Sequence, residues 1–126
     1  MRIVRFLAAA AVLGAVATPC AAQTAGNVAK GAELFEDRCA SCHAPTGGGQ
    51  GPNLNGVYGR KAGSVAGFNF SPALKGSGLI WSRSTLDLFL SGPGKAVPGT
   101  AMLLTVPDAQ QRGDVISYLA TLSAGH

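Results

Sequence analysis

Two cysteines and a histidine lie within one stretch of five residues and supply the most reactive side chains of the chain. The segment Cys39-Ala40-Ser41-Cys42-His43 has the spacing C-x-x-C-H, which is the attachment signature of c-type haem. Residues three and four apart share one face of a helix, so Cys39 can meet both Cys42 and His43 there. The two thiols can form thioether bonds to the two vinyl groups of one porphyrin. We therefore predict one covalently bound haem c, with His43 as the proximal ligand of its iron.

The same cysteines allow other interpretations. C-x-x-C also occurs in thiol–disulfide exchange sites and structural disulfides, but exchange sites of the thioredoxin type belong to a βαβ pattern that this sequence lacks. Zinc usually takes four ligands in separated pairs, and the only other histidine is His126. An iron–sulfur cluster generally needs four thiolates, and the chain has three cysteines. A non-haem thiol oxidoreductase is thus the distant alternative.

Met102 is the candidate for the second axial ligand of the iron. It is the only methionine besides the first residue, and thioether sulfur suits haem iron. Histidine alone would leave the iron open, whereas histidine plus methionine closes the site and raises the reduction potential. Pro98 and Gly99 come shortly before Met102 and set a stiff, non-helical approach. A lone methionine can also be a flexible core filler, but these features favour ligation by His43 and Met102.

The start of the chain has the composition of a secretory signal peptide. Arg2 and Arg5 form a charged beginning, residues 6–17 are apolar apart from one glycine, and small residues lead up to Ala22. The apolar run is shorter than the roughly 20 residues that span hydrocarbon, so a retained membrane anchor is the weaker interpretation. Lipid attachment at Cys20 is disfavoured by the proline before it.

Cleavage after Ala22 divides the chain into a signal peptide, residues 1–22, and one domain, residues 23–126. The 126-residue chain has ten basic and six acidic residues, and losing Arg2 and Arg5 reduces its net charge from +4 to +2. Such a mild charge argues against nucleic-acid binding and suits a weak, transient encounter with an acidic partner protein. We expect an exported, periplasmic monomer.

Helical patterns account for the regular structure of this domain. Three segments repeat apolar residues at helical spacing behind an N-cap residue: one from Asn27 to Cys42, one from Ser84, with Asp87 completing a capping box, to Gly92-Pro93, and one from Asp108 to Gly125. A further helical turn is expected at Ser71-Pro72, where proline takes the first helical position. No convincing strand pattern is present.

A long glycine-rich stretch separates the first helix from the others. Residues 43–70 contain eight glycines, and glycine raises the conformational entropy that folding must overcome. A structureless segment of that length is unusual in a compact domain. The helices are too few to bury enough apolar surface alone, so something large and apolar should fill the centre. The predicted fold is all-α, with helices and long loops wrapped around one haem.

Several separated motifs extend this interpretation to nearly the whole domain. In chain order they are Gly31 and Phe35, Cys39 to His43, Gly51-Pro52-Asn53-Leu54, Gly59-Arg60, Gly67-Phe68, Trp81, Pro98-Gly99-Thr100 with Met102, and Tyr118-Leu119. From about Ala29 to Leu122 the chain therefore resembles the class I cytochromes c, especially bacterial cytochrome c2 and its mitochondrial relatives.

The resemblance implies roles for further residues. Pro52 should offer its carbonyl to the free ring nitrogen of His43, which fixes the imidazole. Trp81 and Arg60 are similar to the groups that hydrogen-bond or neutralise a buried haem propionate. Thr100 is similar to the residue that backs the methionine loop. The contact of Gly31 and Phe35 with Leu119 would join the first and last helices.

The resemblance also implies a function. The chain should be an electron carrier rather than an enzyme, cycling between Fe(II) and Fe(III) and passing electrons between redox partner proteins. It would meet a membrane only through membrane-bound redox complexes. Two alternatives stay open: a dedicated haem subunit of a dehydrogenase or oxidase complex, and an open-site, ligand-binding or peroxidase-like haem protein.

The sequence departs from the family pattern at several positions near the expected haem. Phe70 and Phe89 stand where mitochondrial relatives usually carry tyrosines, and Leu74 replaces a usual asparagine, which implies a drier pocket. The lysine ring around the haem edge is thin, with Arg38 and Lys95 as its remaining cations. Strongly electrostatic partner docking is therefore not expected.

Overall fold

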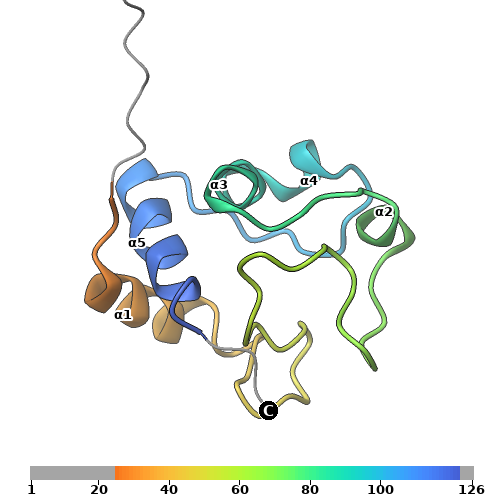
Figure 1. Ribbon diagram of the computed structural model, residues 1–126, viewed down its shortest axis with the longest axis horizontal. Helices are drawn as coiled ribbons and strands as arrows, with labels where there is room; N and C mark the ends of the chain where they lie inside the picture. The colour runs from red at the N-terminus through yellow and green to blue at the C-terminus, as the bar shows by residue number, and fades with distance from the viewer. Residues whose placement is uncertain (1–24, 123–126) are drawn as a thin grey trace, which may run out of the picture.

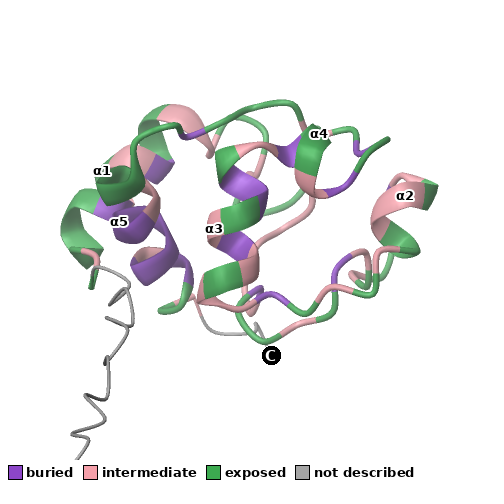
Figure 2. Cartoon of the chain, turned by 90° about the horizontal axis from the view of Figure 1, so that it is seen from above, coloured by how far each residue is buried: buried purple, intermediate pink, exposed green. Residues whose placement is uncertain are grey.

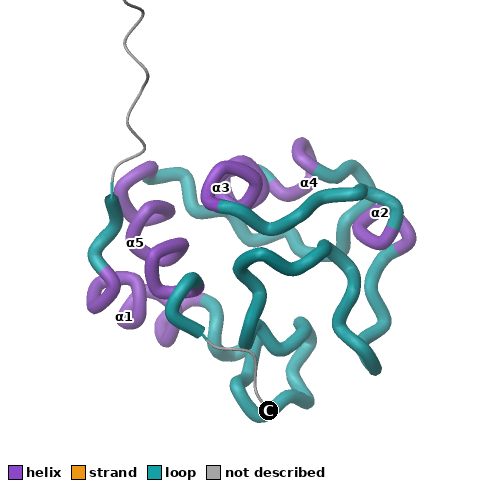
Figure 3. The backbone as a smooth tube through the Cα atoms, viewed as in Figure 1, coloured by secondary structure: helices purple, strands orange, loops and turns teal. Residues whose placement is uncertain are grey.

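Helices and long loops make up the chain in a computed structural model, which describes residues 25–122 (Figure 1). In chain order the helices are α1 (Val28–Arg38), α2 (Pro72–Lys75), α3 (Arg83–Ser91), α4 (Pro93–Ala96) and α5 (Ala109–Leu119). Among the described residues the only β-type pairing is an isolated bridge between Lys61 and Ile80, and Figure 3 shows loops over most of the remainder. The prediction of an all-α fold is confirmed, while the predicted signal peptide, residues 1–22, lies outside the described residues.

The predicted starts of three helices are confirmed by their cap hydrogen bonds. The Asn27 side chain accepts from the Lys30 N–H at 3.0 Å, and the Asp108 carboxylate accepts from the Gln111 N–H at 2.7 Å. Ser71 caps α2, with proline at the first helical position. Each cap satisfies a backbone N–H group that has no partner inside its helix.

The predicted ends of helices are less accurate. α1 ends at Arg38, one turn before Cys42, and α5 ends at Leu119 rather than at Gly125. Just beyond α5 the Leu122 carbonyl accepts a hydrogen bond from the Gly56 N–H at 2.9 Å. A tertiary contact of this kind leaves no periodic signal in the sequence.

The start of α3 and the region after it also differ from prediction. The capping box uses Ser82 and Thr85 rather than Ser84 and Asp87, because the Asp87 carboxylate accepts a hydrogen bond from Arg112 Nε at 2.7 Å. The Gly92-Pro93 pair ends α3 as expected, but its proline also opens the short helix α4, consistent with the preference for proline at the first helical position.

The contact between α1 and α5 joins the two ends of the domain (Figure 1). Gly31 makes a close approach possible, because a Cβ there would run into the backbone carbonyl of Asp114. Beside it the rings of Phe35 and Tyr118 pack at a centroid distance of 5.3 Å with a 54° tilt. Phe35 and Leu119 are both buried in the same apolar cluster, as the resemblance implies.

Many buried residues of the domain lie along α5 and α3, and others lie on α1 and in the loops (Figure 2). They include Leu86, Phe89, Leu90, Val115, Ile116 and Leu119. α3 contacts both α5 and α4, and the loop segments between α1 and α3 close the opposite side (Figure 3). Helices therefore enclose part of the interior of the domain, and loops enclose the rest.

None of the helices within residues 25–122 combines the length and apolarity needed to cross a membrane.

A buried carboxylate secures the entry into α1. Asp114 on α5 is buried, and its Oδ1 accepts from the Asn27 N–H at 2.7 Å and from Gln110 Nε2 at 2.9 Å. The hydrogen bond from the Asn27 backbone is the main cause that holds the pKa of Asp114 below its ordinary value, with smaller help from Gln110 and Lys30. Hydrogen bonds to the charged form favour ionisation.

We expect Asp114→Asn to lower the free energy of unfolding at neutral pH by about 1 kcal/mol, the net contribution of a typical hydrogen bond. Because folding lowers the pKa of Asp114, its ionisation stabilises the domain above the unfolded-state pKa near 4, and this contribution is lost as pH falls through the folded pKa. The difference in the free energy of unfolding between variant and wild type should therefore become smaller below about pH 4. Guanidinium unfolding of the holoprotein at several pH values measures it.

The matched control is Asp37→Asn, which neutralises an exposed carboxylate on α1. A surface change of this kind should stay within about 0.5 kcal/mol of wild type. A pH-independent gap for Asp114→Asn would contradict the role of the charge.

Candidate functional site

A cavity of about 400 Å³ lies between the helices and the loops. Its walls are mainly apolar and come from every part of the domain, including Phe35, Leu54, Trp81, Leu86, Phe89 and Leu119. Cys39, Cys42, His43 and Met102 line the same cavity. Residues about 60 positions apart in the sequence are thus brought to one site, within the size range of cofactor and ligand pockets.

The His43 ring is fixed by the loop opposite it. Its Nδ1 lies 2.8 Å from the Pro52 carbonyl oxygen. A carbonyl can only accept, so Nδ1 carries a proton, and in the neutral ring Nε2 then keeps its lone pair. An imidazole in this tautomer is ready to ligate a metal through Nε2. The implied Pro52–His43 contact is therefore present.

The absence of a side chain at Gly51 leaves room for the His43 imidazole. A Cβ at this position would lie 2.6 Å from His43 Cε1 and 2.7 Å from Nδ1, well inside van der Waals contact. The Gly51 N–H also donates to the Cys42 carbonyl at 2.8 Å. The loop thus packs directly on the motif that bears the histidine.

The two cysteines stand at the end of α1 and in the turn that follows it. The Cys39 carbonyl accepts from the N–H groups of Cys42 at 3.1 Å and His43 at 2.8 Å, so one further helical turn joins the three residues. Burial raises the pKa of the Cys39 thiol. Reactive exchange cysteines have lowered pKa values, so this environment disfavours the thiol oxidoreductase alternative.

The zinc alternative would need a cluster of ligating side chains. Within the described part of the chain, no group of three or more His, Cys, Asp and Glu side chains is arranged to hold a metal ion. Structural zinc usually takes four such ligands.

Arg60 and Trp81 lie side by side at the cavity. The backbone N–H of Trp81 donates to the Arg60 carbonyl at 2.9 Å. The Trp81 ring packs edge-on against Phe89, with a centroid distance of 5.0 Å. The Arg60 guanidinium donates to the carbonyls of Asn55 at 2.8 Å and Asn53 at 3.3 Å. These bonds leave other N–H groups of its five for an anionic group in the cavity.

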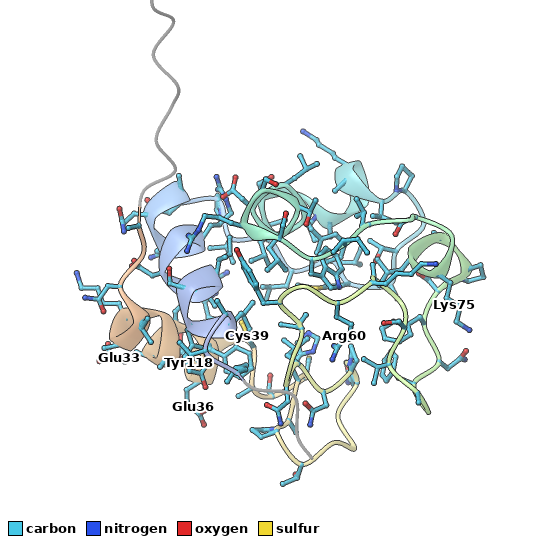
Figure 4. The ribbon with its side chains drawn as sticks, viewed as in Figure 1. Glu33, Glu36, Cys39, Arg60, Lys75 and Tyr118 are labelled. Atoms are coloured by element: carbon cyan, nitrogen blue, oxygen red, sulfur yellow. The ribbon has the colours of Figure 1, made fainter. Side chains whose placement is uncertain are left out.

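Burial also affects the Arg60 guanidinium. It lowers the pKa of Arg60, because the charge lies in a partly desolvated place. Figure 4 shows Arg60 near the middle of the molecule and Cys39 at the end of α1, whereas Lys75 lies at the outer edge on α2.

The segment that carries Met102 follows a tight turn. Gly99 has φ +91°, which favours glycine, and the Thr100 N–H donates to the Val97 carbonyl at 3.0 Å. Thr100 is buried and Met102 half-buried, and both line the cavity. The predicted non-helical approach to Met102 is confirmed.

The departures from the family pattern line the same cavity. Phe70 and Phe89 are buried, and Leu74 is half-buried. Val57 and Val106 are also buried cavity residues, and they were not anticipated from the sequence. Each lies in an irregular segment, where no periodic pattern marks the buried side.

Fold and site together define a small all-α domain with a central, mainly apolar cavity lined by two cysteines, a histidine and a methionine. The cytochrome c family model matches residues 28–123. The chain therefore belongs to the cytochrome c family, whose members are haem-containing electron-transfer proteins rather than enzymes.

Individual relatives cover most of the chain. It is 47% identical over 104 residues to cytochrome c2 of Rhodomicrobium vannielii, covering 79% of this chain and 82% of that protein. It is 40% identical over 103 residues to cytochrome c of Sesamum indicum, covering 79% of this chain and 93% of that protein. The structure of cytochrome cH from Methylobacterium extorquens matches with a TM-score of 0.72 and 43% identity, covering 76% of this chain and 99% of that one.

We expect Gly51→Ala to displace the His43 ring or the loop that packs on it, since the added methyl would overlap the imidazole. Overpacking of this kind costs about 1–3 kcal/mol of folding free energy. In the holoprotein, the Nδ1–H resonance of His43 should shift and exchange faster with solvent. Gly94→Ala is the matched control, because a Cβ there would meet no atom within 4 Å. If both variants behave alike, the proposed fit of glycine against imidazole is wrong.

Proposed function

We propose that the chain is a periplasmic electron carrier with one haem c, joined covalently to Cys39 and Cys42 and ligated by His43 and Met102. The observation that carries this proposal is the shared cavity: two thiols, an imidazole with its Nε2 lone pair free and a thioether all line one apolar space.

The donor set fits this group. Two cysteines three residues apart match two vinyl groups of one porphyrin, and imidazole with thioether is a common axial pair for haem iron. The apolar walls suit the porphyrin ring, and Arg60 retains N–H groups suited to a propionate. When bound, haem c supplies reversible one-electron chemistry.

The surrounding residues would keep the site rigid. Pro52 fixes the tautomer and orientation of His43. Arg60 is held by two backbone carbonyls, and Trp81 by its packing against Phe89. Buried Thr100 backs the loop that carries Met102. A site closed by two protein ligands needs little rearrangement when its charge changes, which favours transfer of electrons over turnover of a substrate.

Redox partner proteins are the proposed partners, and the chain is proposed to act as a monomer. The mild net charge expected after cleavage and the few cations near the cavity support weak, transient encounters. Contact with a membrane would come only through membrane-bound redox complexes.

Met102→Ala tests the axial ligation. Wild type, purified from a host that matures c-type haem, should show sharp ferrous bands and the weak long-wavelength ferric band of sulfur on iron. The variant should lose that ferric band, lower its reduction potential, and bind one carbon monoxide per haem when reduced, whereas wild type binds essentially none.

The control for this experiment is Leu103→Ala, which shortens the neighbouring, 79% exposed side chain and leaves the thioether in place. It should keep the ferric sulfur band. Equal carbon monoxide binding by wild type and Met102→Ala would instead favour the open-site haem protein.

Export through a cleaved signal peptide, residues 1–22, is part of the proposal and rests on the composition of that segment. The intact mass of protein from the periplasm should correspond to residues 23–126 plus one haem. A double Cys39→Ser, Cys42→Ser variant, matched in length, should lack the haem mass. A full-length chain in the membrane fraction would support a retained anchor instead.

A further inference from the structure

The loop that carries Met102 is held weakly by its own backbone. It has buried anchors at both ends: the Thr100 N–H donates to the Val97 carbonyl at 3.0 Å, and the Val106 N–H donates to the Leu90 carbonyl at 2.8 Å. Between these anchors, residues 101–105 make no backbone–backbone hydrogen bond within the described part of the chain. Segments with few hydrogen bonds and exposed side chains open at low free-energy cost.

One side chain forms a hydrogen bond to this segment of residues 101–105. Arg38 Nη2 donates to the Thr105 carbonyl at 3.1 Å, across 67 positions of sequence. Arg38 is the last residue of α1 and directly precedes Cys39. The hydrogen bond therefore ties the Met102 side of the cavity to the helix that carries the cysteine motif.

A second arginine, Arg112, binds carbonyl groups just beyond the loop. Arg112 Nη1 donates to the carbonyls of Val106 at 3.0 Å and Pro107 at 2.8 Å, and its Nε donates to Asp87. These contacts secure the anchor beyond the loop. Only Arg38 donates to a carbonyl of residues 101–105 among the hydrogen bonds of residues 25–122.

We infer that Arg38 is a positioning residue, which acts as a latch that keeps the Met102 loop closed over the cavity. The inference rests on the proposed ligation by Met102. The loop is then a two-state element, closed with Met102 at the cavity or open with the axial position free. Losing the latch shifts this equilibrium toward the open state by the free energy of one hydrogen bond.

Two simpler roles must be separated from the latch. A cation in the last turn of α1 stabilises the helix through its dipole, which would affect the stability of the whole domain. A cation on this face also changes the local charge near the cavity. Lys95 serves as the control for this charge effect. It lines a surface groove together with Leu103 and Thr105, and its side chain makes no hydrogen bond in the described structure.

The test compares holoproteins of wild type, Arg38→Gln and Lys95→Gln. Imidazole is titrated into each ferric protein while the methionine–sulfur band is followed, and guanidinium unfolding is measured in parallel. Imidazole binds only when the loop is open, so its apparent affinity reports the open population. We expect Arg38→Gln to raise this affinity roughly two- to ten-fold over wild type and Lys95→Gln to leave it within about two-fold.

The outcomes are distinct. A higher imidazole affinity in Arg38→Gln alone, with global unfolding close to that of Lys95→Gln, supports the latch. An equal rise in imidazole affinity in both variants assigns the effect to charge. Lower global stability of Arg38→Gln without a change in imidazole affinity assigns Arg38 to the helix end. Either result overturns the latch. Absence of the sulfur band in wild type overturns both the latch and the proposed Met102 ligation.

Discussion

The central apolar cavity is the constraint on which the rest of the structure depends. α1, α3 and α5 are short, and several of their buried side chains line this space together with residues from the loops. A chain with so many glycines must overcome a large conformational entropy. A large apolar group bound in the cavity would supply the missing burial, so the cofactor of a cytochrome c is structural as well as redox-active.

The loops are ordered around the cavity by contacts to backbone groups rather than by secondary structure. Pro52 and Gly51 hold the His43 ring, and Arg60 ties its loop to the carbonyls of Asn53 and Asn55. Such bonds fix irregular segments without a sheet or a helix. They also place polar groups at the rim of an apolar space, where they can orient a cofactor without filling its site.

Local features of the chain were predictable because their causes are local. Asn27, Ser71 and Asp108 start helices because each side chain can bond an N–H group a few residues ahead. The cysteine–histidine motif is recognisable because attachment requires a fixed spacing within one turn. Helix ends were harder to predict: α5 ends at Leu119, and just beyond it the Leu122 carbonyl accepts a hydrogen bond from the Gly56 N–H, far away in the sequence.

The sequence by itself therefore determined the all-α class, the starts of α1, α2 and α5, and the cysteine–histidine motif that predicts haem attachment. Only the tertiary structure decided which residues share a cavity, and that the Ser82–Thr85 box, rather than Ser84–Asp87, begins α3. It alone brought Arg38 to the carbonyl of Thr105. Spacing encodes contacts within a few residues, whereas contacts between distant segments depend on how the whole chain packs around its centre.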